Sequence, residues 1–133
     1  MNKPQISISK DREVLLEAIQ EYFGSKLQSV SLLNASTNNP KLLVLADPLE
    51  RPKRVLYQNF NRVRSYLQNN LTDDCLKKSL KNVEIVSHYD IELDDPLIWE
   101  LYMEGEIFYD QFNILFNRIK RFSTLVGENV YLV

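Results

Sequence analysis

Residue types that carry out chemistry are sparse in this chain. His88 is the single histidine and Cys75 the single cysteine. A Ser–His or Cys–His mechanism would need His88, but no nucleophile motif surrounds it. One cysteine rules out an internal disulfide and a cysteine-based metal cluster. The sequence also has no zinc-ligand spacing, no Walker loop and no glycine-rich dinucleotide motif, so these site classes are excluded.

Charged side chains are segregated into two blocks. The acidic block runs from Asp90 to Asp110 and contains no lysine or arginine. Two solvated helix faces would explain both blocks, and the net charge of −2 gives the molecule no strong attraction to nucleic acid. Arginine interleaved with aromatic residues can nevertheless bind single-stranded nucleic acid. The basic block, which contains no acid, consists of Arg51, Lys53, Arg54, Arg62 and Arg64.

The elements that must position these residues follow from hydrophobic periodicity and turn signals. Asp11 or Ser9 can cap the first helix, and Gly24 can end it. The segment 75–80 could add a helical turn, and 130–133 could be a terminal strand or could pack against a partner. We expect helices at 11–24, 52–71, 94–105 and 110–125, and strands at 27–33, 42–46, 83–86 and 106–109.

This order resembles the αββαβα arrangement of the minimal nucleotidyltransferase domain over roughly residues 11–110. Three stretches carry the resemblance: the hairpin 28–47 leading into a proline-bounded helix, the strand Asn82-Val-Glu-Ile-Val86, and Asp95-Pro-Leu-Ile-Trp-Glu-Leu-Tyr-Met-Glu-Gly-Glu-Ile-Phe-Tyr-Asp110. The last is similar to the family's closing helix, a Glu-Gly pair and an apolar strand ending in Tyr-Asp.

The resemblance implies an α/β (α+β) fold with a small mixed or antiparallel sheet flanked by helices. A C-terminal amphipathic helix is added to this core. We expect one domain over residues 1–133, with the core at about 11–110 and the C-terminal helix and tail at 110–133.

In that family a Gly-Ser loop cradles phosphates, and Asp-x-Asp with a third carboxylate holds Mg²⁺. Here the glycine position falls on Asn34 or Ala35, and Ser36 can stand for the serine. The Asp-x-Asp positions fall on Asn39-Pro-Lys41, so a lysine would oppose a metal ion. Glu84 is the candidate third carboxylate. We therefore expect a degenerate member with no catalytic residues, no metal and no cofactor, and a residual nucleotide site at Asn34, Ser36, Lys41 and Glu84.

The leading hypothesis is an inactive nucleotidyltransferase-fold protein that acts as a binding or regulatory partner. The resemblance implies a HEPN-type helical partner in a toxin–antitoxin-like pair; a homo-oligomer would use the same exposed surface, with Phe112, Phe116 and Leu132. One alternative is an active enzyme with a rearranged Mg²⁺–nucleotide site around Ser36 and Glu84. Another is a nucleic-acid-binding module using the 51–64 face. A cytoplasmic location without membrane association is expected, since no membrane span or signal-peptide core is apparent.

Overall fold

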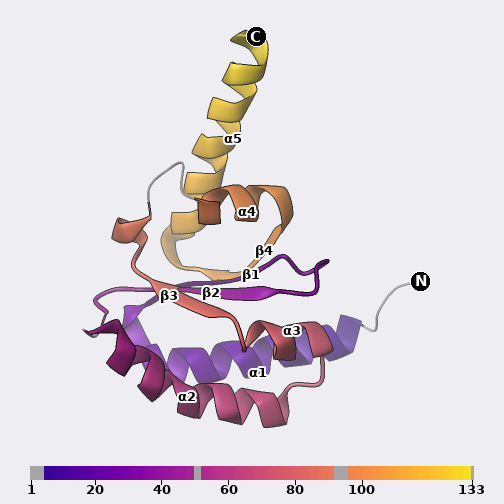
Figure 1. The fold of residues 1–133 in the computed structure, drawn as a ribbon, viewed down its shortest axis with the longest axis vertical. Helices are drawn as coiled ribbons and strands as arrows, with labels where there is room; N and C mark the ends of the chain where they lie inside the picture. The colour runs from indigo at the N-terminus through magenta and orange to yellow at the C-terminus, as the bar shows by residue number, and fades with distance from the viewer. Residues whose placement is uncertain (1–4, 50–51, 92–95, 133) are drawn as a thin grey trace.

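Helices cover both faces of a four-stranded sheet in the computed structural model, which describes residues 5–49, 52–91 and 96–132 (Figure 1). In chain order the elements are α1 (Gln5–Phe23), β1 (Leu27–Leu33), β2 (Lys41–Ala46), α2 (Lys53–Asn70), α3 (Asp74–Ser79), β3 (Val83–Val86), α4 (Pro96–Glu104), β4 (Gly105–Asp110) and α5 (Ile114–Leu132), with short 3₁₀ turns at Gly24–Lys26, His88–Asp90 and Gln111–Asn113. This order contains the αββαβα order that the resemblance implies, followed by the expected strand β4 and helix α5, with α3 inserted between α2 and β3.

The sheet is mixed, and its strand order is β3-β2-β1-β4. β1 pairs antiparallel with both β2 and β4, whereas β2 pairs parallel with β3. The predicted antiparallel hairpin of β1 and β2 is confirmed, with Leu33 opposite Lys41 at its closed end. The predicted mixed sheet flanked by helices is therefore the architecture of the chain.

Alternation along β2 sends its side chains into two separate cores. Leu42 and Val44 pack with the layer of α1, α2 and α3, while Leu43 and Leu45 pack with α4 and α5. Figure 1 shows these two helical layers on opposite sides of the sheet. Because both faces are covered, β2 reads as a continuous apolar run in the sequence.

The start of α1 differs from the prediction. The helix begins at Gln5, so Asp11 lies within it and does not cap it. Asp11 is 3% exposed, and its carboxylate accepts hydrogen bonds from the Thr72 N–H and hydroxyl and from the Asp73 N–H at 2.6 Å. Asp73 in turn caps α3 by accepting from the Leu76 N–H at 3.0 Å. The carboxylate predicted as a local cap thus holds a distant loop, because α1 packs against α2 and its connection to α3.

Two glycines are required by the backbone. Gly24 has φ +60°, the left-handed conformation that ends α1 as predicted. Gly105 has a different role: a Cβ there would lie 2.7 Å from the Leu101 Cα and 2.8 Å from the Leu101 O. The chain can therefore pass directly from α4 into β4 only with glycine at this position. The acids predicted to begin α4, Asp94 and Asp95, lie outside the described residues.

The C-terminal region departs most from the prediction. The helix begins at Ile114 and not at Asp110, because β4 continues to Asp110 and a turn with left-handed Phe112 and Asn113 follows. Phe112 is 83% exposed, as expected for the surface predicted to contain it. The Asp110 carboxylate accepts from the N–H groups of the first helical turn, at 3.0 and 2.8 Å.

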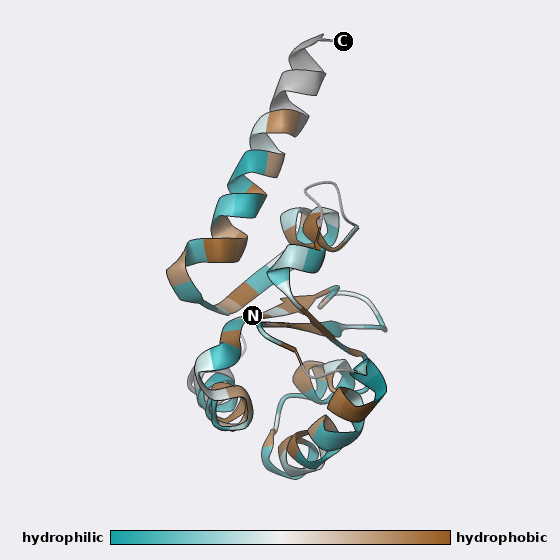
Figure 2. Ribbon diagram, turned by 90° about the vertical axis from the view of Figure 1, so that its left-hand side faces the viewer, coloured by the Kyte–Doolittle hydropathy of each residue, from teal (hydrophilic) through white to brown (hydrophobic). Residues whose placement is uncertain are grey.

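The prediction of a terminal strand at 130–133 is wrong for its described part, since α5 runs to Leu132. A short apolar run fits a helical stripe as well as a strand, so periodicity alone could not separate them. In both ribbon views α5 extends beyond the sheet and α4 (Figure 2). None of the helices in the described ranges has the length and apolarity needed to cross a bilayer.

Candidate functional site

The loop 34–40 between β1 and β2 is a tightly bonded turn. Asn34 has φ 56°, a left-handed conformation that glycine adopts freely and asparagine tolerates. The Thr37 N–H and hydroxyl both donate to the Asn34 carbonyl, at 3.1 and 2.8 Å. The Asn39 N–H donates to the Thr37 hydroxyl at 3.1 Å. The turn therefore depends on the left-handed backbone at Asn34 and on the hydrogen bonds made by Thr37.

A carboxylate from α4 lies at the same loop. The Ser36 N–H donates to the Glu104 carboxylate at 2.7 Å. Hydrogen bonds from the Ser36 side chain and backbone stabilise the charged form and lower the pKa of Glu104. The N–H groups of Ser36, Thr37 and Asn39 thus all have partners within the protein. A phosphate could reach the Ser36 N–H only by displacing an anion that is already there.

Lys41 is the first residue of β2 and points to the same face of the sheet as Leu43 and Leu45. Parallel pairing places β3 beside it, with Glu84 opposite Leu43. The Lys41 Nζ lies 3.4 Å from the Glu84 Oε1 and 4.0 Å from the Glu100 Oε2 of α4. Three elements therefore bring one ammonium between two carboxylates.

This arrangement does not fit Mg²⁺. The ion requires several oxygen ligands at about 2.0–2.1 Å, whereas Lys41 places a positive charge between the two carboxylates of Glu84 and Glu100. The described ranges contain no group of three Asp, Glu, His or Cys side chains positioned to hold a metal ion. Within the same part of the chain, the buried Glu100 Oε2 has no hydrogen-bond partner, so the Lys41 ammonium supplies its counter-charge.

The described residues of the predicted basic face lie at different places along α2. Arg51 lies outside the described residues. The Arg64 Nε donates to the Leu80 carbonyl at 2.7 Å, which ties α2 to the end of α3. Lys53 and Arg54 lie in the first turn of α2, whereas Arg62 lines a hollow between α1 and α2. These basic residues therefore serve different surroundings, although the sequence places them in one block.

Glu100 and Glu104 were not singled out in the sequence as site residues. The sequence could have indicated that they act together, because residues at i and i+4 lie on the same side of a helix. The sequence did not indicate which way α4 faces. In the structure the Glu100 carboxylate lies near Lys41 and the Glu104 carboxylate binds the Ser36 N–H. Helix α4 therefore packs beside the loop that connects β1 and β2.

A second feature of the α4–α5 layer is an aromatic cluster of Trp99, Tyr102 and Phe122. The Phe122 ring lies edge-on to both other rings, with centroids 5.4 Å apart in each case. Trp99 is 48% exposed although it belongs to this cluster. Further exposed apolar side chains on the same helices and their connecting turn are Met103, Phe112, Phe116 and Leu125. The side chain of Leu132, predicted as part of this surface, lies outside the described part.

No protein-family model and no curated protein sequence matches this chain. Solved structures resemble it at low sequence identity. A chain of the crystal structure of the toxin–antitoxin MntA-HepT is 14% identical, with 93% of this chain and 94% of that chain covered and a TM-score of 0.48. A chain of the tri-AMPylated Shewanella oneidensis HEPN toxin in complex with MNT antitoxin is 15% identical, with 93% of each chain covered and a TM-score of 0.49.

A chain of a toxin–antitoxin crystal structure with AMP-PNP is 16% identical. The superposition covers 91% of this chain and 94% of that chain, with a TM-score of 0.43. Likeness at this level carries no conclusion about activity, partner or ligand.

Proposed function

We propose that this chain is a nucleotidyltransferase-fold protein that acts by binding a protein partner and not by nucleotidyl transfer. The observation that carries the proposal is the Lys41 ammonium between Glu84 and Glu100. In the resembling family, the position of Lys41 holds a carboxylate that binds a metal ion. An ammonium there offsets one of the two negative charges and repels a metal ion at the position where the family places a ligand.

The loop adds independent support. Phosphate binding by a loop requires backbone N–H groups that face solvent or ligand. In this chain the Ser36 N–H donates to Glu104, and the Asn39 N–H donates to Thr37. Both halves of a nucleotide–metal site are thus occupied by side chains of the protein itself.

The partner surface that we propose is the aromatic cluster of Trp99, Tyr102 and Phe122 with its exposed apolar neighbours. Exposed aromatic and methionine side chains are enriched in protein interfaces. The family resemblance suggests a helical HEPN-type protein as the partner, in a toxin–antitoxin-like pair. A homo-oligomer through the same cluster is the competing assembly.

A transfer assay tests the loss of catalysis. The purified chain is incubated with Mg²⁺ or Mn²⁺ and α-³²P-labelled nucleotides. A helical HEPN-type protein, the partner that the family resemblance suggests, is the acceptor. We expect no label in either protein. Labelling that disappears in Glu84→Gln, but persists in the matched exposed variant Glu21→Gln, would refute the proposal and support the rearranged enzyme.

A binding assay tests the surface. Co-expression with the same helical protein, followed by isothermal titration, should give a complex that Phe116→Ser or Trp99→Ala weakens by about tenfold or more, as expected for interface hot spots. Tyr66→Ala, an exposed aromatic change on the other layer, is the matched control. Light scattering of the chain alone reports a homo-oligomer. If none of the cluster variants changes either assembly, the proposed surface is wrong.

A further inference from the structure

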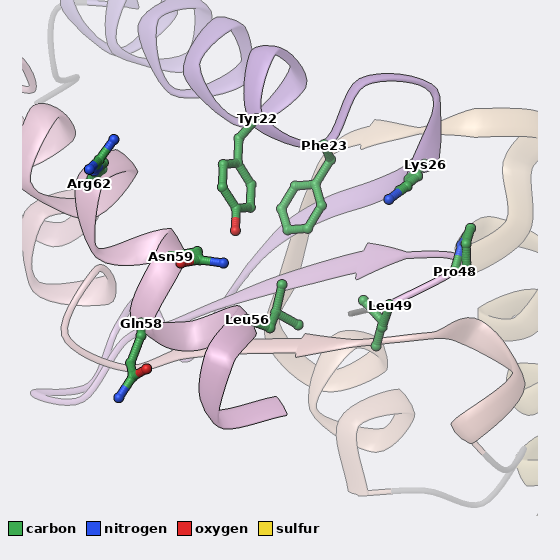
Figure 3. Close-up of a pocket in the computed structure, with 9 residues that line it drawn as sticks. All are labelled: Tyr22, Phe23, Lys26, Pro48, Leu49, Leu56, Gln58, Asn59 and Arg62. Carbon is green, nitrogen blue, oxygen red and sulfur yellow. The ribbon is translucent and has the colours of Figure 1, made fainter. Parts of the chain in front are cut away.

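A separate pocket lies at the opposite end of the strands from Lys41. It is found where α1 leads into β1 and where β2 leads toward α2, and its volume is about 620 Å³. β1 has seven residues, which puts this pocket roughly 20 Å from the loop 34–40 at a rise of about 3.3 Å per residue. The lining residues are Tyr22, Phe23, Lys26, Pro48, Leu49, Leu56, Gln58, Asn59 and Arg62 (Figure 3).

The floor of the pocket is apolar and aromatic. Phe23 and Leu56 are buried, and the Tyr22 ring stands edge-on to Phe23 with centroids 4.8 Å apart. Leu49 and Pro48 continue the apolar surface toward β2. A flat ring can stack or pack on such a floor, since aromatic rings favour offset and edge-on contacts.

The walls carry positive charge without acid. Lys26 and Arg62 both line the pocket, and none of its lining residues is acidic. Figure 3 shows the two cations at opposite ends, with Tyr22 and Phe23 between them. Neither cation forms an ion pair with another described side chain. The acidic side chains Glu17 and Glu21 line an adjoining hollow that shares Tyr22 and Arg62 with this pocket. Their negative charge therefore lies in that hollow rather than in this pocket.

Two amide side chains complete the walls. Gln58 and Asn59 lie one helical turn before Arg62 on α2, and both are exposed at the pocket. Amide groups both donate and accept hydrogen bonds. Pockets of about 300–1,000 Å³ with an apolar lining and a few polar groups are the usual form of small-molecule sites.

We propose that this pocket binds a small organic phosphate that carries a flat ring, of the size of a nucleoside monophosphate. The ring packs on Tyr22 and Phe23, one cation binds the phosphate, and the other cation and the amides contact polar atoms of the ring. Arginine and lysine are both suited to phosphate, the former through paired N–H donors. The site is independent of the Lys41 cluster and of the proposed loss of transfer activity.

Titration of the ¹⁵N-labelled chain with the four nucleoside 5′-monophosphates tests the proposal. We expect saturable amide shifts at residues 22–26 and 56–62 for at least one of them, and none at 34–41. Lys26→Gln and Arg62→Gln should each weaken binding about tenfold or more. The reason is that the loss of one hydrogen bond to a charged group raises the dissociation constant by at least that factor. Arg54→Gln, on the same helix but outside the lining, should leave affinity unchanged.

The fragments of the ligand supply the remaining outcomes. The nucleoside and inorganic phosphate should each bind more weakly than the monophosphate, since each reaches only part of the pocket. The proposal is overturned if no monophosphate gives saturable shifts at millimolar concentration, or if inorganic phosphate binds equally well. It is also overturned if Lys26→Gln and Arg62→Gln leave the affinity unchanged. Shifts confined to 34–41 would overturn this proposal and would also speak against the proposed function, whereas saturable shifts at both places would leave this pocket as a second site.

Discussion

Replacement of Lys41 by methionine isolates the ammonium while preserving most of the apolar stem. The variant removes two attractions, at 3.4 Å to Glu84 and at 4.0 Å to Glu100. Each is worth about 1 kcal/mol at the dielectric constant of water. The side chains of Lys41, Glu84 and Glu100 are 21%, 37% and 30% exposed. Because solvent screens charges at such exposure, the value for water is used rather than the larger value for a protein interior. Glu84 and Glu100 would then repel each other without a counter-charge.

We expect Lys41→Met to lower the free energy of unfolding by about 2 kcal/mol, the sum of the two lost attractions. Urea denaturation followed by circular dichroism at low salt measures it. Lys81→Met, at an exposed lysine outside the cluster, is the matched control and should change little. A double-mutant cycle with Glu84→Gln should return a coupling energy of about 1 kcal/mol.

Lys41→Asp extends the test to metal binding. A third carboxylate beside Glu84 and Glu100 should destabilise the fold more than methionine does, because three like charges then face one another. A divalent cation at ten times its dissociation constant should restore about 1.4 kcal/mol. A stability of Lys41→Met equal to that of the parent protein, together with zero coupling to Glu84, would refute the view that the ammonium balances this cluster.

Three further predictions follow from single contacts. Asp11→Ala should lower the free energy of unfolding by about 2–4 kcal/mol, because it leaves buried N–H donors unpaired; the exposed Glu13→Ala is its control in urea denaturation. The pKa of Glu104 is lowered, so the charged Glu104 stabilises the folded protein at neutral pH. This stabilisation is lost as the pH falls below 4.5, the ordinary pKa of a glutamate, and through the lowered pKa. The Ser36 amide proton shift should titrate in that window, and a persisting titration in Glu104→Gln would contradict the contact. Asn34→Ala should cost about 1–2 kcal/mol at a left-handed position, while a thermal scan should show Asn34→Gly close to the parent; equal losses would disprove the backbone explanation.

The fold was largely predictable because its signals are local. The continuous apolar run of β2 indicates burial on both faces, and the structure confirms it. The apolar stripe of α2 comprises Leu56, Phe60, Val63 and Leu67, and the structure buries all of them except Val63, which is half-buried. Gly24 ends its helix as expected. The end of α5 was not predictable in the same way, since four apolar residues satisfy either period.

The sequence by itself determined that a lysine immediately precedes the apolar run of the second strand and that Glu84 lies on the third strand. The tertiary structure decided what that lysine does. Only the path of α4 across the sheet brings Glu100 to Lys41 and Glu104 to Ser36, from segments far apart in the chain. Hydrophobic periodicity encodes which side of a helix is buried. It does not encode which polar side chains then meet at the edge of that buried side, because their meeting depends on how separate elements pack.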